Sequence, residues 1–373
     1  MAESRQVAVK MEWGPGARFL MVLAAAVVVV AGLRAGAPIL LPFSLALFLA
    51  ILTLPILLWL QGRGVPTPLA IVLAVLVDIA IIGLVLLLAA QSVTDLEARL
   101  PVYTRRLSGL FEGWVALFQD RGIPIGEFMV GDLISATAVM DFTRGILARA
   151  ASILSTAFIV FLILIFILAE ASIFPEKFRA VLGKEDGDMG RFAKITGEVL
   201  EYLIIKTLVS LGTGICIGLW AWLMGLDFPI LLGIIGFVLN YVPTIGSILA
   251  AIPAILLAIV QFSGLGPAIL VGTGYLGINV VFGNLLEPQL LGRRLGLSTL
   301  VVILSLIFWA FVWGPIGALL AVPLTMIVKI MLENTEDLKW VAVLLDKEPP
   351  SRPVEVPPST PTSIPGPEPE ASG

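Results

Sequence analysis

Residues 240–254 read NYVPTIGSILAAIPA, and residues 310–325 read AFVWGPIGALLAVPLT. Each stretch carries a proline, a glycine close behind it, and an apolar run that a second proline closes. They lie in apolar runs of 33 residues, 229–261 and 299–331, longer than the ~20 residues that one membrane crossing needs. The shared pattern predicts two Pro/Gly-interrupted hairpins that form a weak internal repeat.

The composition indicates a membrane protein. Hydrophobic residues make up 58% of the chain and charged residues 13%, with a mean hydropathy of +1.04, whereas soluble domains carry about 25% charged residues. The apolar residues fall in long uncharged runs, which is typical of membrane-spanning helices and not of outer-membrane barrels. We therefore predict an all-α, polytopic helical bundle in a lipid bilayer.

The apolar runs divide the chain into regions. The first run could be read as a signal peptide, but a cut at Ala-x-Ala would leave Pro38 directly after it, so we expect an uncleaved helix. Ordinary spans are expected at 19–34, 38–60, 69–91, 150–170, 199–223 and 266–286. The predicted regions are an N-terminus (1–18), three spans (19–91), an amphipathic region (92–149), a transmembrane domain (150–345) and a disordered, Pro-rich tail (346–373).

Basic residues near the ends of the spans predict the orientation. They are denser in the segment 171–198 than in 92–149, and Arg293-Arg294 marks another basic end. Both termini are therefore expected in the cytoplasm, and 92–149 on the outer side. The two hairpins would then enter from opposite faces, either as re-entrant segments or as tilted full spans.

The interruptions suggest a transport pathway. Proline removes a backbone donor and leaves polar groups unpaired at membrane depth, which is tolerated only inside protein or beside a watery cavity. In secondary transporters, paired interruptions in inverted halves mark the substrate site. The alternative is that proline and glycine merely kink the helices for packing. The candidate pathway residues in the hairpins are Pro243, Thr244, Gly246, Pro253, Gly317 and Pro323.

Polar residues inside the apolar runs are further candidates. Asp78 lies near the centre of its run, where an ionised carboxylate is costly and function is the default hypothesis. Asp78 could instead be protonated and hold a helix contact, and Lys206 could either pair with it or snorkel to the surface. Beside the hairpins lie Asn240, Asn279, Asn284, Glu287 and Pro288. Neutral amides suit a small polar solute, although each Asn could instead bind helices together.

The region 92–149 begins with a heptad pattern. Its apolar seam predicts a helix that needs an apolar partner, either the amphipathic stretch 128–146 or the same helix of a neighbouring subunit. The sequence leaves both partners open. The seam is Leu96, Leu100, Tyr103, Leu107, Leu110, Trp114 and Leu117.

Signs of enzyme chemistry are missing from the sequence. It has no His and a single Cys, Cys216, which argues against disulfides and His-ligated metals. It has no G-x-x-x-x-G-K-[ST] phosphate loop. We therefore expect no catalytic residues, metal, cofactor or nucleic-acid partner.

Several strings together resemble a known family. VPTIGSILAAIPAILLA, GNLLEPQLLGRRLGLSTLVVILSLIFWAF, WGPIGALLAVPLT and the early joint PILLWLQGRGVPTPLA are similar to the AI-2E family, the autoinducer-2 exporter or PerM-like permeases of bacteria. The likeness covers roughly residues 20–340. The chain departs from the family pattern at Ser298-Thr299 and before Pro55.

The resemblance implies a bacterial inner-membrane permease that exports a small polar metabolite, autoinducer-2 being the namesake. It also implies a homo-oligomer, with a pentamer as one form. Some relatives are described as Na⁺/H⁺ antiporters, which gives a second hypothesis in which Asp78 and Lys206 couple to ions. A third hypothesis is a scaffold that does not transport and binds a partner through the outward heptad helix.

Overall fold

The computed structural model describes residues 15–119, 156–171, 186–262, 264–291, 297–333 and 339–346. Within these ranges the chain is helical and contains no strand. Six helices there are long and apolar enough to cross a membrane. The predicted all-α, polytopic fold is therefore confirmed, while the predicted tail and the stretch 128–146 lie outside the described residues.

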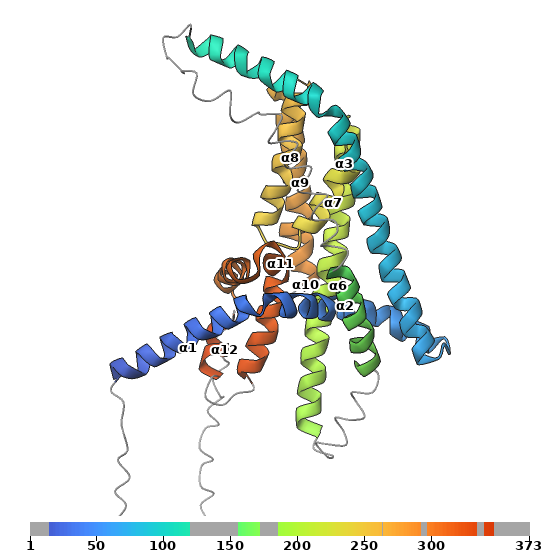
Figure 1. Cartoon of the computed structure of the whole chain (residues 1–373), viewed down its shortest axis with the longest axis vertical. Helices are drawn as coiled ribbons and strands as arrows, with labels where there is room; N and C mark the ends of the chain where they lie inside the picture. Colours follow the sequence, from blue (N-terminus) through green and yellow to red (C-terminus); the bar gives the residue numbers. More distant parts are fainter. Residues whose placement is uncertain are drawn as a thin grey trace, which may run out of the picture.

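The N-terminal part consists of α1 (Pro15–Ala35), α2 (Ala37–Gly62) and α3 (Thr67–Gln119). In Figure 1, α1 projects to the left of the bundle and α2 passes across it, whereas α3 runs beside the other helices and continues past them. The helix Thr156–Ala171 shares an apolar cluster with α2 and α3. The span predicted at 69–91 and the start of the heptad helix are thus one continuous helix.

The C-terminal part contains the interrupted segments. Its main packing is of α6 along α7 and of α8 along α9. Its elements are α6 (Asp186–Leu223), α7 (Pro229–Leu239), α8 (Ile245–Phe262), α9 (Leu265–Asn279), the π-helix η1 (Val280–Leu286), α10 (Glu287–Leu291), α11 (Thr299–Glu333) and α12 (Lys339–Leu345).

Both quoted stretches are broken where the sequence predicts. Between α7 and α8 the chain turns at residues 240–244, and Thr244 has a φ of 60°. Within α11, Gly314 has a φ of 67° and a ψ of −150°, so that two helices meet there in different directions (Figure 1). The closing prolines, Pro253 and Pro323, lie inside helices and do not end them. The opposite entry of the two segments into the membrane stays a prediction.

The two breaks share a packing device. A Cβ atom on Gly246 would overlap the carbonyl oxygen of Leu239, and one on Gly317 would overlap that of Trp309. Each glycine therefore lets the helix after the break lie against the backbone before it. Only a residue without a side chain fits such a contact, which explains why the glycine recurs in both stretches.

One run that the sequence treats as ordinary is irregular. The segment 266–286 was expected to be a simple span, but its last seven residues form the π-helix η1. A π-helix is rare and is found mostly at functional sites. The predicted span is present within Leu265–Leu291, and only its expected regularity was wrong, because Pro and Gly breaks are visible in a sequence, whereas a π-helix has no such marker.

Glycines also bring α6 and α7 together. A Cβ on Gly214 would lie 2.8 Å from the carbonyl oxygen of Gly233, and one on Gly233 would lie 2.8 Å from that of Gly214. Small residues four apart, here Gly214 and Gly218, let membrane helices approach closely. The close approach holds the start of the interrupted segment against the middle of α6.

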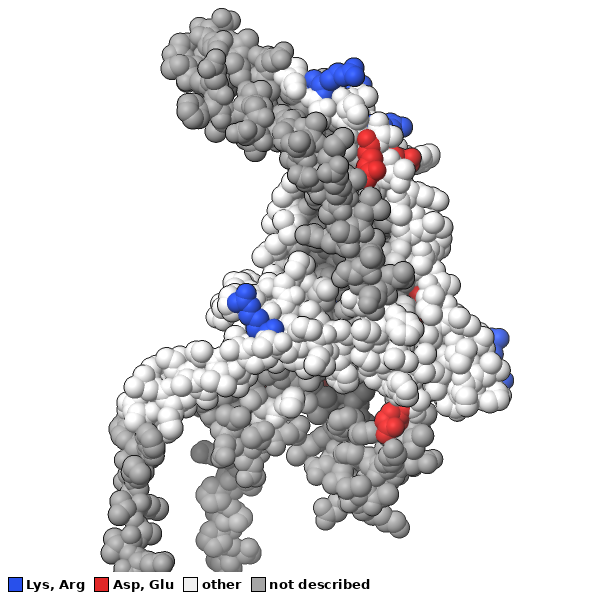
Figure 2. All heavy atoms as spheres, viewed as in Figure 1, with Lys and Arg blue, Asp and Glu red and all other residues white. Residues whose placement is uncertain are grey.

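The distribution of charge fits a membrane protein. On the face drawn in Figure 2, charged side chains gather near the end of α3 that passes beyond the bundle and again lower down, and the uncovered band between them carries almost no charge. Such a band is expected where lipid tails surround the protein, because charges there are costly.

The first described residues of the heptad seam contact the same chain. Leu96, Leu100 and Tyr103 are half-buried, and α3 packs against α7 and α8. The seam beyond Tyr103 lies outside the described side chains. Its first part contacts the interrupted segment, and the two partners that the sequence suggested stay predictions.

We expect the close contact at Gly246 to be essential for stability. Gly246→Ala forces a Cβ into the backbone of Leu239 and should lower the free energy of unfolding by about 1–3 kcal/mol. Gly277→Ala is the matched control, since a Cβ there meets nothing within 4 Å; it should be neutral or stabilising by up to about 1 kcal/mol. Thermal unfolding in detergent compares the two, and equal shifts would contradict the packing argument.

Candidate functional site

One face of α6 carries a row of buried polar side chains. Tyr202, Lys206, Ser210 and Thr213 are 6%, 2%, 0% and 3% exposed. Their spacings of 4, 4 and 3 residues place them on one face of the helix. Buried polar groups in a membrane need partners inside the protein, and this row therefore points toward other polar residues.

The break between α7 and α8 supplies one partner for Ser210 of this row and another for the neighbouring Thr207. Asn240 is 5% exposed, and its Nδ2 donates a hydrogen bond to Ser210 Oγ at 3.0 Å. The Tyr241 hydroxyl donates to Thr207 Oγ1 at 2.8 Å, and Thr207 in turn donates to the carbonyl of Leu203 at 2.7 Å. The broken backbone thus lies against the middle of α6, about one helical turn from Lys206.

Lys206 forms an ion pair with Glu287. Its Nζ lies 2.6 Å from Glu287 Oε1, and the two side chains are 3% and 19% exposed. Glu287 begins α10 directly after the π-helix. The pairing of Lys206 with Asp78 that the sequence allowed is therefore not formed, because the irregular end of the 266–286 run brings a closer carboxylate to the ammonium group.

These side chains form one polar cluster of six residues, in which three separate elements meet. It combines an amide, two hydroxyls and a phenol with one cation and one anion, so its net charge is zero. Such a set can donate to and accept from a small uncharged solute, and it offers no activated nucleophile. The polar cluster is Lys206, Thr207, Ser210, Asn240, Tyr241 and Glu287.

The other predicted pathway residues lie around the cluster or apart from it. Gly246, Gly317 and Pro323 are buried, Pro243, Pro253 and Asn279 are half-buried, and Thr244, Asn284 and Pro288 are exposed. The structure therefore brings together Asn240, Glu287 and Lys206, but not Asn284 or Pro288. Pro323 lines an apolar pocket with Phe48 and Leu203.

Asp78 has a different environment. It is 8% exposed, and its Oδ2 lies 2.5 Å from Thr53 Oγ1, which is also 2.7 Å from the carbonyl oxygen of Leu49. The hydroxyl has one proton, so it can donate to only one of these two oxygens. A protonated Asp78 that donates to Thr53 would satisfy both contacts, which suits a buried acid between α2 and α3.

Three residues of the cluster were missed in the sequence. Ser210, Thr207 and Tyr241 look unremarkable alone, because hydroxyls occur often in membrane helices, where they can bond to the backbone one turn earlier. The buried row on α6 was a usable signal, since Lys206 and Ser210 lie four residues apart in an apolar run. Among the described residues, no three His, Cys, Asp or Glu side chains gather as a metal site requires.

Comparison with known proteins identifies the family. The profile of the AI-2E family transporter matches residues 20–337. The chain belongs to the AI-2E transporter family. The AI-2 transport protein TqsA of Escherichia coli K12 is 39% identical over 334 residues, which cover 88% of this chain and 96% of the relative.

Two further relatives agree with this family. The putative transport protein YhhT of Escherichia coli K12 is 34% identical over 339 residues, covering 91% of this chain and 96% of the relative. A putative transport protein of Haemophilus influenzae is 36% identical over 335 residues, with 88% and 96% covered. Together with the six apolar helices, the AI-2E family supports a multi-pass permease of a bacterial inner membrane. The family and the names of its relatives indicate a transporter.

The ion pair of the polar cluster can be tested by its energetics. Removing one partner of a buried pair leaves an uncompensated charge and costs about 3–5 kcal/mol, whereas removing both can be nearly neutral. Lys206→Met alone should therefore destabilise more than the double variant Lys206→Met/Glu287→Gln. Chemical denaturation of the singles and the double gives the coupling free energy. Simple additivity would show that the two side chains do not interact.

Proposed function

We propose that this AI-2E family member exports a small polar solute, AI-2 or a metabolite of similar size and polarity, past the polar cluster. One observation carries the proposal: at the broken backbone, the side-chain amide of Asn240 donates to the hydroxyl of Ser210 beside the Lys206–Glu287 ion pair. Interrupted helices around a midplane site are typical of secondary transporters. TqsA, which is named an AI-2 transport protein, supports the choice of solute class.

The chemistry of the cluster favours an uncharged solute. Asn240 and the neighbouring hydroxyls can exchange hydrogen bonds with hydroxyl and carbonyl groups, and Glu287 already neutralises Lys206. A strongly anionic solute would call for several unpaired cations. The proposed route continues along both breaks, past Pro243, Thr244, Gly246 and Pro253 on one side and Gly317 and Pro323 on the other, with Asn279 beside the π-helix.

Two further parts of the proposal concern assembly and orientation. Asn284 and Pro288 are exposed on and just after the π-helix, and a polar side chain at membrane depth rarely faces lipid. We propose that a neighbouring subunit of a homo-oligomer covers them, a pentamer being the form that the resemblance implies.

The distribution of basic residues supports cytoplasmic termini, with the outer end of α3 on the extracytoplasmic side.

Transport by proteoliposomes tests the site. Purified protein is reconstituted, candidate solutes are loaded, and efflux is measured with and without Na⁺ and proton gradients. Asn240→Ala should reduce the initial rate about tenfold or more, because a lost hydrogen bond to a bound solute and to Ser210 is worth roughly 1.4 kcal/mol. Ser210→Ala should act in the same direction.

Thr273→Val is the matched control for these replacements. Its hydroxyl is exposed on α9 and bonds only within its own helix, to the carbonyls of Ile269 and Leu270. Its efflux should equal that of the wild type. Equal losses in Asn240→Ala and Thr273→Val would remove the polar cluster from the pathway, and a wild type that moves none of the solutes would count against the export proposal.

Na⁺/H⁺ antiport is a second candidate, favoured by the burial of Asp78 and its contact with Thr53. If Asp78 only holds α2 against α3 as a protonated acid, Asp78→Asn can keep that hydrogen bond and should leave solute efflux within about twofold of the wild type. If the protein is an antiporter, the same change should abolish Na⁺-dependent collapse of a pH gradient. A pH-sensitive dye inside the proteoliposomes distinguishes the two outcomes.

A further inference from the structure

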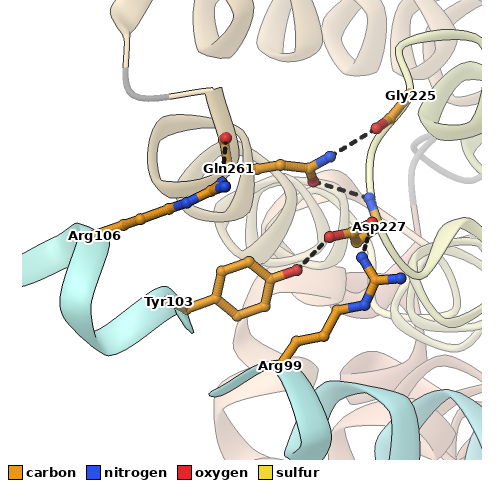
Figure 3. A network of polar contacts seen from close by, with 6 residues as sticks. All are labelled: Arg99, Tyr103, Arg106, Gly225, Asp227 and Gln261. Carbon is orange, nitrogen blue, oxygen red and sulfur yellow. Dashed lines mark hydrogen bonds and ion pairs between the residues drawn. The ribbon is translucent and has the colours of Figure 1, made fainter. Parts of the chain in front are cut away.

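A second polar network lies where α3 continues past the rest of the bundle. It joins α3 to both ends of the α7–α8 segment, which are far apart in the sequence (Figure 3). We call it the clamp. It consists of Arg99, Tyr103 and Arg106 from α3, Gly225 and Asp227 from the α6–α7 turn, and Gln261 near the end of α8.

Gln261 closes the base of the α7–α8 segment. Its Oε1 accepts from the backbone N–H of Asp227 at 2.9 Å, and its Nε2 donates to the carbonyl of Gly225 at 2.7 Å. One side chain at the end of α8 therefore satisfies two backbone groups just before α7. The two ends of the segment are held together at this point.

Three side chains of α3 hold this base. Arg99 Nη1 lies 2.7 Å from Asp227 Oδ1, the Tyr103 hydroxyl donates to Asp227 Oδ2 at 2.5 Å, and Arg106 Nη1 donates to the carbonyl of Gln261 at 2.6 Å. Both carboxylate oxygens of Asp227 are thus engaged by α3 (Figure 3).

The clamp also holds a strained residue. Phe228 has a φ of 59°, which is unfavourable for a bulky side chain and persists only where its surroundings determine it. Its ring packs edge-to-face against Tyr103 with centroids 6.4 Å apart, and the Arg99 guanidinium lies 5.8 Å from its centroid. Because Phe228 immediately precedes α7, the clamp fixes the direction in which α7 leaves the turn.

The base of the segment is linked to the polar cluster through α7. This helix has 11 residues and is therefore about 16 Å long, so the break at residues 240–244 lies about that far from the clamp. A small rotation at the base would displace Asn240 from Ser210. We propose that Asp227 is a positioning residue for transport: held by Arg99 and Tyr103, it sets where the 240–244 break lies in the polar cluster. This inference rests on the proposed function.

The position of the break can be measured directly. Spin labels on Thr244→Cys at the break and Leu223→Cys at the end of α6, with Cys216→Ala, report their distance by pulsed EPR in liposomes. Arg99→Gln and Asp227→Asn should increase the population of distances outside the wild-type peak about two- to fivefold, the range that a partly exposed ion pair supports. Tyr103→Phe, which removes one hydroxyl only, should act in the same direction.

Two controls separate positioning from general damage. Arg99→Lys keeps the charge and should restore most of the wild-type distribution. Arg105→Gln removes an exposed charge of α3 outside the clamp and should change nothing. In liposomes that hold the unlabelled variants, the maximal efflux rate should fall in Arg99→Gln and Asp227→Asn by about the same factor as the distance populations change.

The two readouts distinguish the possible failures. Unchanged distances in Arg99→Gln and Asp227→Asn would overturn the inference, whatever the transport result. Altered distances with unaltered efflux would show that the clamp positions the break without serving transport, which would also overturn it. If the wild type moves no solute, the proposed function fails, and the transport role of Asp227 fails with it, while the distances still show whether the clamp holds the break.

Discussion

The structure depends on one constraint: lipid cannot hydrogen bond to a broken backbone or to a polar side chain. Wherever α7 and α8 or the two parts of α11 separate, amides and carbonyls must find partners within the protein. The turn at residues 240–244 is therefore placed against α6 rather than against lipid. Asn240, Tyr241, Ser210 and Thr207 pair with one another as a consequence of the break.

Close packing of α6 against α7 makes this pairing possible. Asparagine and serine are short, so α7 has to approach α6 nearly backbone to backbone before Asn240 can contact Ser210. Gly214 and Gly233 permit that approach, and Gly246 then lets α8 start beside the end of α7. The glycines and the polar cluster are thus parts of one arrangement, because replacing the glycines would move the polar side chains of α6 and of the break apart.

The sequence predicts the features that depend on residues close together in the chain. The apolar runs predicted the helical membrane fold, and the Pro/Gly pattern predicted both breaks. Pairings between distant residues were not predictable in the same way: Lys206 finds Glu287 rather than Asp78, because a π-helix with no marker in the sequence turns Glu287 inward. The clamp was missed for a similar reason, since Asp227 and Gln261 are ordinary residues at the ends of apolar runs until α3 is seen to pass beside them.

The two sides of the polar cluster are held with different strength. On one side, α6 and α7 are in close contact through glycines, and the base of the α7–α8 segment is fixed to α3. On the other side, the π-helix has no buried residue, and its link to α6 includes the ion pair of Glu287 with Lys206. A transporter that opens its site alternately to the two sides of the membrane needs one part of the protein to move relative to another around that site. Under the proposed function, a break that is held on one side and faces a π-helix without buried residues would meet that need, and the Lys206–Glu287 ion pair is where the two sides would separate.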